Sequence, residues 1–318
     1  MDTKLSVNIG KLKLKNPVMV ASGTFGYGEE FKDFFALKEL GAIVTKTITL
    51  KARQGNLPPR TCETPAGMLN SIGLENPGIG VFLKEKLPGL KKTGVPIIVS
   101  IASEDDPQEF VILSRRLDTI KEVAAIELNI SCPNIKSAQR KTHNARRTTQ
   151  SATLISQDPQ VTYDLVSAVR KATKKVLITK LSPNVTDISE IARAAEKAGS
   201  DALSLINTIT AMSIDVETRK PKIAAITGGL SGPAIRPIAV RMVWQVYKNT
   251  KLPIIGMGGI IDTPSALEFI ISGASAISVG TANFIHPKAS VEIIAGLKSY
   301  LEQNKIRDIN SLIGSLKL

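Results

Sequence analysis

Residues 123–134 of this 318-residue chain read Val-Ala-Ala-Ile-Glu-Leu-Asn-Ile-Ser-Cys-Pro-Asn, and they indicate how the chain is built. The first part, Val123–Leu128, is short and largely apolar, which predicts a strand that is covered on both faces. The second part places a thiol, Cys132, at the carboxyl end of that strand, between Asn129 and Asn134. A thiol can act as an acid or base near neutral pH, and flanking amides can hold a planar ring. A small buried cysteine in a turn would have the same sequence, so this stretch alone favours neither interpretation.

The rest of the chain repeats this pattern of short apolar strands separated by amphipathic helices. The other expected strands are Val18–Ala21, Ala42–Thr45, Ile97–Ile101, Val176–Lys180, Ala202–Ile206, Ile254–Met257 and Ala276–Val279. The clearest helical stretches are Pro107–Leu117, Val161–Thr173, Ile188–Ala198, Ala234–Tyr247 and Pro264–Ser272, with Asp187 and Thr263 as expected N-caps and Gly199 and Gly273 as expected helix stops. Eight such units predict an α/β fold, a single (β/α)8 TIM barrel domain over residues 1–318. An open doubly wound sheet is the alternative, but the turn after the first strand lacks a Gly-x-Gly-x-x-Gly motif.

Three segments depart from the repeat. Residues 4–15 alternate apolar and polar around Gly10, which predicts an N-terminal β-hairpin. Residues 213–224 interrupt the pattern after the sixth strand and suggest a second excursion, that is, another segment outside the strand–helix repeat. Residues 137–158 are polar, basic and without periodicity, so we expect a long loop insertion there. Its composition favours a disordered insertion, and the alternative is that it docks an acidic partner or gates a site.

Composition narrows the class of protein. No stretch approaches the roughly 20 apolar residues that span a bilayer, and no apolar signal core follows Met1, so we expect a cytoplasmic protein. The two cysteines, Cys62 and Cys132, are too few for a disulfide framework or a four-thiolate metal site, so we expect no metal. The net charge of +13 suits an anionic substrate, a nucleic acid or a membrane surface, but it also fits a general lysine bias. Aromatic residues make up only 4% of the chain, which argues against a platform for stacking nucleic-acid bases.

In a TIM barrel the chemistry lies in the loops that follow the strands. Polar residues and glycines recur at these positions, namely Ser22 and Gly23, Lys46 and Thr47, Asn129, Lys180, and Asn207 and Thr208. Asn70 begins a further polar loop, and packing alone does not predict such recurrence at successive strand ends. We therefore expect these side chains to converge on one pocket. Glycines at 258–259 and 280, after the last two strands, favour a phosphate site there over plain turns.

Together these residues resemble the class 1 dihydroorotate dehydrogenases, flavin enzymes of pyrimidine biosynthesis, over nearly the whole chain. The matching motifs are ASGTFGYG (21–28), TKT (45–47), NSIGLENPG (70–78), ELNISCPN (127–134), KLSPNVTD (180–187), LINT (205–208), GGLSGPAI (228–235), GMGGI (256–260) and GTA (280–282). A cysteine base distinguishes class 1 from class 2, which uses serine. The string NISCPNIK is most similar to class 1B, which passes electrons to NAD through a partner subunit that carries FAD and a [2Fe-2S] cluster.

The resemblance implies a function and a set of site residues. Cys132 would remove the proton at C5 of dihydroorotate while a hydride leaves C6 for FMN, and the product is orotate. FMN would be bound by Ser22, Lys46, Thr47, Ser100, Asn129, Lys180, Ile206, Gly232, Gly258, Gly259, Gly280 and Thr281. Substrate would be bound by Lys46, Asn70, Ser71, Ile72, Gly73, Leu74, Asn129, Asn134, Asn207 and Thr208. We also expect a homodimer, or a heterotetramer with the iron–sulfur flavoprotein subunit, and no membrane or nucleic-acid partner.

The chain departs from the family pattern at two places. Ser100 and Ser103 stand where the family usually has Asn and Gly, so Ser100 would reach the flavin with a shorter side chain. The loop after Cys132 is longer by about a dozen residues than a compact connection requires, which bears on lid closure and partner docking. Three alternatives stay open: a fumarate-dependent class 1A homodimer, a flavin enzyme related to tRNA-dihydrouridine synthases, and a non-catalytic basic scaffold. The second has Gly in its Asn-x-Gly-Cys-Pro motif where this chain has Ser131.

Overall fold

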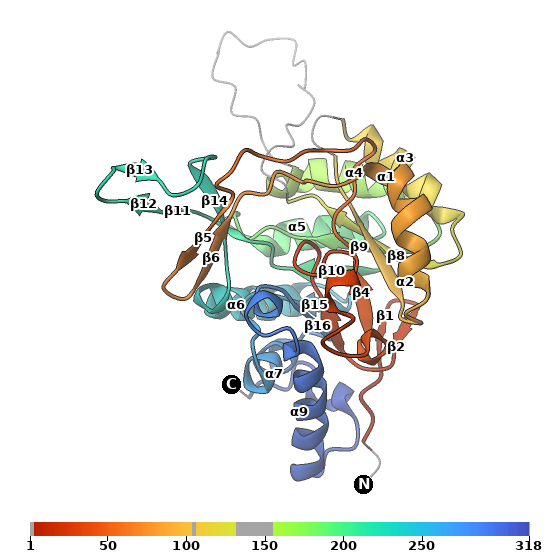
Figure 1. Ribbon diagram of the computed structural model, residues 1–318. Helices are drawn as coiled ribbons and strands as arrows, with labels where there is room; N and C mark the ends of the chain where they lie inside the picture. The colour runs from red at the N-terminus through yellow and green to blue at the C-terminus, as the bar shows by residue number, and fades with distance from the viewer. Residues whose placement is uncertain (1–2, 104–105, 132–154, 318) are drawn as a thin grey trace.

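The computed structural model describes residues 3–103, 106–131 and 155–317. Its centre is a closed parallel barrel of eight strands, which confirms the expected TIM barrel (Figure 1). In barrel order the strands are β3 (Val18–Val20), β4 (Ala42–Val44), β7 (Ile97–Ile101), β8 (Val123–Asn129), β9 (Val176–Lys180), β10 (Ala202–Leu205), β15 (Ile254–Gly256) and β16 (Ala276–Val279). Cys132, Asn134 and most of the basic insertion lie outside the described residues.

Helices surround the barrel and follow the strands in turn. They are α1 (Gly78–Val81), α2 (Leu87–Lys91), α3 (Gln108–Asp118), α4 (Pro159–Ala172), α5 (Ile188–Lys197), α6 (Arg236–Asn249), α7 (Thr263–Ser272), α8 (Ala282–Ile285) and α9 (Ala289–Gln303). A π-helical turn, Phe82–Lys86, joins α1 to α2. Shorter 3-10 turns lie at Glu29–Phe31, Leu37–Glu39, Ile155–Gln157, Pro233–Ile235 and Ile309–Leu312. Among the described helices, none is long and apolar enough to cross a membrane.

The helix ends agree with the expected signals at three of four positions. Asp187 caps α5, and Gly199 and Gly273, with φ of +98° and +125°, follow the ends of α5 and α7. The expected N-cap Thr263 is wrong, because it is the first helical residue of α7. Asp262 caps that helix instead, since its carboxylate accepts a hydrogen bond from the Ser265 backbone N–H at 2.9 Å.

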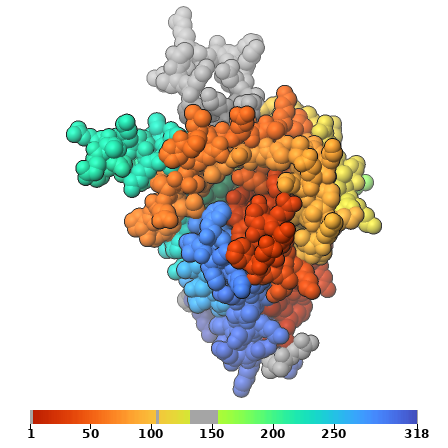
Figure 2. Space-filling view, viewed as in Figure 1, coloured from red at the N-terminus to blue at the C-terminus, as the bar shows by residue number. Residues whose placement is uncertain are grey.

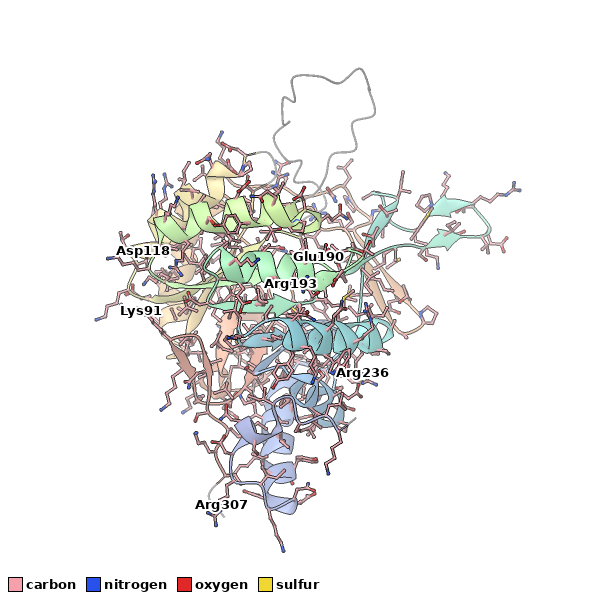
Figure 3. All side chains as sticks on the ribbon, turned by 180° about the vertical axis from the view of Figure 1, so that it is seen from behind. Lys91, Asp118, Glu190, Arg193, Arg236 and Arg307 are labelled. Atoms are coloured by element: carbon pink, nitrogen blue, oxygen red, sulfur yellow. The ribbon has the colours of Figure 1, made fainter. Side chains whose placement is uncertain are left out.

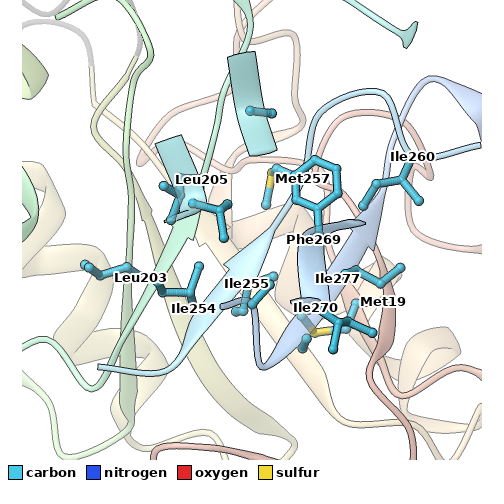
Figure 4. Packing of buried hydrophobic residues seen from close by; sticks show 14 of the residues in the cluster. Met19, Leu203, Leu205, Ile254, Ile255, Met257, Ile260, Phe269, Ile270 and Ile277 are labelled. Atoms are coloured by element: carbon cyan, nitrogen blue, oxygen red, sulfur yellow. The ribbon is translucent and has the colours of Figure 1, made fainter. Parts of the chain in front are cut away.

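Apolar packing joins the helices to the barrel. Figure 4 shows the cluster around β10, β15 and β16, where Leu203 lies beside Ile254, and Ile277 lies close to Ile270 of α7. Gly256 is required there, because a Cβ at this position would lie 2.6 Å from the Phe269 ring of α7. The outward faces of the helices carry charged side chains, such as Glu190 and Arg193 of α5 (Figure 3).

Two antiparallel strand pairs expected from the sequence lie outside the barrel. The expected hairpin is formed by β1 (Val7–Ile9) and β2 (Leu12–Leu14), which turn at Gly10 with φ of +57°. The expected excursion contains a two-stranded ribbon, β12 (Ile214–Asp215) and β13 (Lys220–Pro221), that projects from the body of the molecule (Figures 1 and 2).

A four-stranded antiparallel sheet was not expected from the sequence. Its strands lie in the order β11 (Ile209–Met212), β14 (Thr227–Ser231), β6 (Gly67–Asn70) and β5 (Thr61–Thr64). The sheet pairs the segment that follows β4 with the segment that follows β10, so Asn70 lies opposite Gly229. It therefore brings parts of two distant loops to the same side of the barrel mouth.

Tyr27 offers a test of the packing outside the site. Its hydroxyl is buried and has no hydrogen-bond partner among the described residues, and its ring lies 5.7 Å from that of Phe82. Burial, and secondarily the Glu30 carboxylate, raises the pKa of Tyr27 to about 12.

We expect Tyr27→Phe to raise the free energy of unfolding by about 1 kcal/mol, because it removes an unpaired buried hydroxyl. The folded protein holds the Tyr27 proton more tightly than the unfolded chain, so the wild type loses stability as the pH rises from about 10 toward the folded value. The variant should lack this loss. Urea unfolding at pH 8 and pH 11 measures both effects, and a less stable variant at pH 8 would show that the hydroxyl has a partner.

Candidate active site

A cavity of about 390 Å³ opens at the carboxyl ends of the barrel strands. Of the residues expected to bind the cofactor, Ser22, Lys46, Thr47, Asn129, Lys180, Ile206, Gly232, Gly258, Gly259, Gly280 and Thr281 line it. Of those expected to bind substrate, Asn70, Ser71, Ile72, Gly73, Leu74, Asn207 and Thr208 also line it. The fold thus brings together residues that are up to 259 positions apart, from Ser22 to Thr281. Their individual contacts with ligands stay predictions.

Ser100 is the exception among the described candidates. Its side chain is fully buried and does not line the cavity. In the register of β7 and β8 it lies beside Glu127, two residues before the end of β8, so it lies deeper in the barrel than Asn129. Its hydroxyl is hydrogen-bonded to Thr47 Oγ1 at 3.0 Å. The structure thus gives Ser100 a contact with Thr47 and no exposed surface, and its expected contact with FMN stays a prediction.

A chain of side-chain hydrogen bonds holds the amides in the cavity. Asn129 Nδ2 donates to Thr47 Oγ1 at 3.3 Å, and Asn207 Nδ2 donates to Asn129 Oδ1 at 3.4 Å. The Thr208 backbone N–H in turn donates to Asn207 Oδ1 at 2.9 Å. Because these groups come from the ends of β4, β8 and β10, this series of hydrogen bonds fixes three strand ends relative to one another. The result is a preorganised, uncharged polar surface.

Lys46 supplies a cation at the end of β4. Its side chain is partly buried, and burial is the main cause that lowers its pKa below the ordinary value. Glu75 opposes this shift and Arg60 adds to it, and these two residues form an ion pair with each other in the loop beside the cavity. Among the described residues no carboxylate forms an ion pair with Lys46, and such a desolvated ammonium is suited to an anionic ligand.

Lys180 supplies a second cation at the end of β9. The residue is buried, and its Nζ donates to the Ser22 hydroxyl at 3.2 Å. Ser131 Oγ donates to the Lys180 carbonyl at 3.0 Å, which anchors the end of β8 to β9. Ser131 itself lines the cavity, so the described chain that leads to Cys132 ends at the cavity wall.

Glycines form one end of the cavity. Gly258 and Gly259 have φ of +128° and +81°, and a Cβ on Gly259 would lie 2.7 Å from the Gly232 carbonyl oxygen. Nearby, Thr281 Oγ1 donates to Ser231 Oγ at 2.8 Å. Bare backbone and hydroxyls at this end leave room for a phosphate group to approach N–H groups closely.

Sequence reasoning missed several residues that line the cavity. Asn184 is the clearest case: its Nδ2 donates to the Thr208 carbonyl at 3.1 Å, and its Oδ1 accepts from the Thr210 N–H at 2.9 Å. Its place four residues after the end of β9 was an available signal. Thr61, Met68 and Gly229 reach the cavity through the unexpected four-stranded sheet, for which the sequence carries no comparable signal.

The comparisons with known proteins agree with this architecture. A family model described as dihydroorotate dehydrogenase matches residues 4–301. Among curated relatives, a protein of Trichlorobacter lovleyi is 52% identical over 317 residues and covers 100% of both chains. A protein of Geotalea uraniireducens is 50% identical over 98% of both chains, and one of Desulforudis audaxviator is 51% identical over 99% of this chain and 98% of its own. All three are called dihydroorotate dehydrogenase B (NAD(+)), catalytic subunit. On these matches, the chain belongs to the dihydroorotate dehydrogenase family.

Proposed function

We propose that this chain oxidises dihydroorotate to orotate in pyrimidine biosynthesis, as the FMN-binding catalytic subunit of an NAD-linked enzyme. The observation that carries the proposal is the single cavity at the barrel mouth, which combines a glycine-lined end, two lysines and a set of connected amides. The names of these relatives support the choice of substrate and of NAD as the final acceptor.

The cavity fits FMN in its chemistry. Gly259, Gly280 and Thr281 would hold the phosphate, because added side-chain volume is absent where backbone N–H groups must come close. Lys180 would lie against the ring system, where a fixed cation stabilises negative charge. When bound, FMN accepts the hydride that leaves the substrate.

The chain's own residues would bind and orient the substrate. Dihydroorotate is an anion, and Lys46 offers it a desolvated ammonium. Asn70, Asn129 and Asn207 would donate to and accept from its ring amides. The bond from Asn207 to Asn129 and the bond from Asn70 to the Gly229 carbonyl would preset their geometry. Cys132 would take the proton from C5.

The partner and the setting of the enzyme are also proposals. We propose that a separate subunit with FAD and a [2Fe-2S] cluster docks on this chain, and that two copies of the chain form a homodimer or, with that subunit, a heterotetramer in the cytoplasm. Ile261 and Phe284 line the cavity and are exposed, as is the adjoining Ile285, which gives an apolar rim beside the cofactor site. Met212, Ile214 and Val216 expose further apolar surface next to the projecting ribbon.

Anaerobic addition of dihydroorotate to the purified, FMN-loaded chain is the direct test. We expect the flavin absorbance near 450 nm to bleach within a single turnover, because the chain holds the complete oxidising half-site. FMN-loaded protein that stays yellow would contradict the proposal. Turnover with fumarate alone would favour the class 1A alternative, whereas turnover that needs both NAD and the second subunit would support the proposed one.

A further inference from the structure

Glu127 of β8 is a buried carboxylate to which the proposed reaction assigns no role. Its side chain is 1% exposed, and Lys180 of β9 is 4% exposed. Across the residues that the structure describes, these two are the only charged side chains that are buried. A charge removed from water is strongly destabilising unless an opposite charge or hydrogen bonds compensate it.

Glu127 and Lys180 both point into the barrel. Ser204 Oγ of β10 donates to Glu127 Oε2 at 3.0 Å, and β9 separates these two strands, so the bond crosses the barrel interior. In the register of β8 and β9, Glu127 lies beside Ile178, and Asn129 lies beside Lys180 two residues further on. Glu127 is therefore on the same face as Lys180 and about 7 Å deeper along the strands.

The other carboxylate oxygen, Glu127 Oε1, has no hydrogen-bond partner among the described residues. Ser204 alone thus compensates little of a full negative charge in this interior. Among the described residues, Lys46 is the only other lysine that lines the cavity, and Lys180 is the buried cation on the strand next to Glu127. Among the described residues no ion pair within 4 Å joins Glu127 to Lys180, so any attraction between them acts over a longer distance through the barrel interior, where charges are screened less than in water.

We propose that Glu127 is a positioning residue for Lys180: its carboxylate is the counter-charge that holds the lysine ammonium beneath the cavity. A consequence, which rests on the proposed function, is that the carboxylate lowers the electron affinity of a flavin bound above it. A negative charge below the ring offsets part of the effect of Lys180.

The counter-charge is tested first without flavin, by a double-mutant cycle on thermal unfolding of the full-length chain. Glu127→Gln and Lys180→Met should each lower the melting temperature, because each leaves one buried charge unpaired. The double variant should melt above the less stable of the two single variants. Additive losses would overturn the proposal. If one single variant fails to fold, a double variant that folds supports the pairing and one that does not fold contradicts it.

Ser204→Ala is the matched control, because it removes the hydrogen bond of Glu127 and leaves both charges in place. Its effect should add to that of Lys180→Met without coupling.

The effect on the cofactor is tested by the midpoint potential of bound FMN. Loss of the Coulomb repulsion between the Glu127 carboxylate and the negative charge of reduced FMN, at an effective dielectric of about 20, predicts that Glu127→Gln raises the reduced-to-oxidised ratio at fixed potential by roughly tenfold. For a two-electron couple this is a shift of about 30 mV to more positive values. An unchanged potential would overturn the tuning role, since a merely structural glutamate would not move it. Wild-type protein that binds no FMN would contradict the proposed function, and the unfolding cycle would still decide the pairing.

Discussion

Cys132→Ala is expected to leave FMN bound and to slow reduction of the flavin by dihydroorotate by roughly 10²–10⁴. The substitution removes the proposed proton acceptor at C5 and leaves in the cavity Lys46, Asn129 and Asn207, which are proposed to bind the substrate. Binding affinity should therefore change little, and the loss should lie in the chemical step. Anaerobic stopped-flow absorbance at saturating dihydroorotate measures this step directly.

Cys62→Ala is the matched control. Cys62 is the free thiol of β5 and does not line the cavity, so its removal should leave the reduction rate near that of the wild type. Cys132→Ser should retain part of the activity, shifted toward high pH, because a hydroxyl is a weaker acid than a thiol. An unchanged single-turnover rate in Cys132→Ala would remove this residue from the mechanism.

The second large effect is expected at the glycine-lined end of the cavity. Gly259→Ala should weaken FMN binding by at least about 100-fold, as measured by titration of the flavin-free protein. The residue has φ of +81°, where an L side chain is strained, and its Cβ would lie 2.7 Å from the Gly232 carbonyl oxygen and 2.9 Å from Arg236 Cβ. The backbone would have to shift in the region proposed to hold the phosphate.

Gly80→Ala separates this local effect from glycine replacement in general. Gly80 lies in helix α1, and an added Cβ there meets nothing within 4 Å. This control should bind FMN normally and be equally or slightly more stable, since alanine favours helix. Normal FMN affinity in Gly259→Ala would show that the cofactor phosphate is bound elsewhere.

The barrel could be predicted because its strands carry a strong local signal. Runs such as Ile97–Ile101 are apolar except for Ser100 and buried throughout, and they alternate with amphipathic helices along the chain. The four-stranded sheet could not be predicted in the same way. Thr61–Thr64 and Thr227–Ser231 are polar or glycine-rich, and they reach β6 from opposite sides in the sheet, so contacts distant in sequence decide their pairing.

The candidate site was predictable where a residue directly follows a strand. Lys46, Asn129 and Lys180 lie at strand ends, and the closed barrel brings such positions to one mouth. The depth of Ser100 could not be predicted, because position along a strand does not reveal how deep the residue lies once neighbouring strands are staggered. The place of Asn184 after β9 could have suggested that it lies near the cavity, but its hydrogen bonds to the segment after β10 could not be read from sequence spacing.

The four-stranded sheet also limits how the molecule can exchange ligand with solvent. Asn70 and Gly229 are paired across β6 and β14, and Asn70 Nδ2 also donates to the Gly229 carbonyl at 3.1 Å. The two loops are therefore joined in one sheet. Neither loop can move outward alone without breaking the hydrogen bonds between β6 and β14. A ligand must therefore enter and leave the cavity past the part of its rim that this sheet does not cover, or both loops must move together.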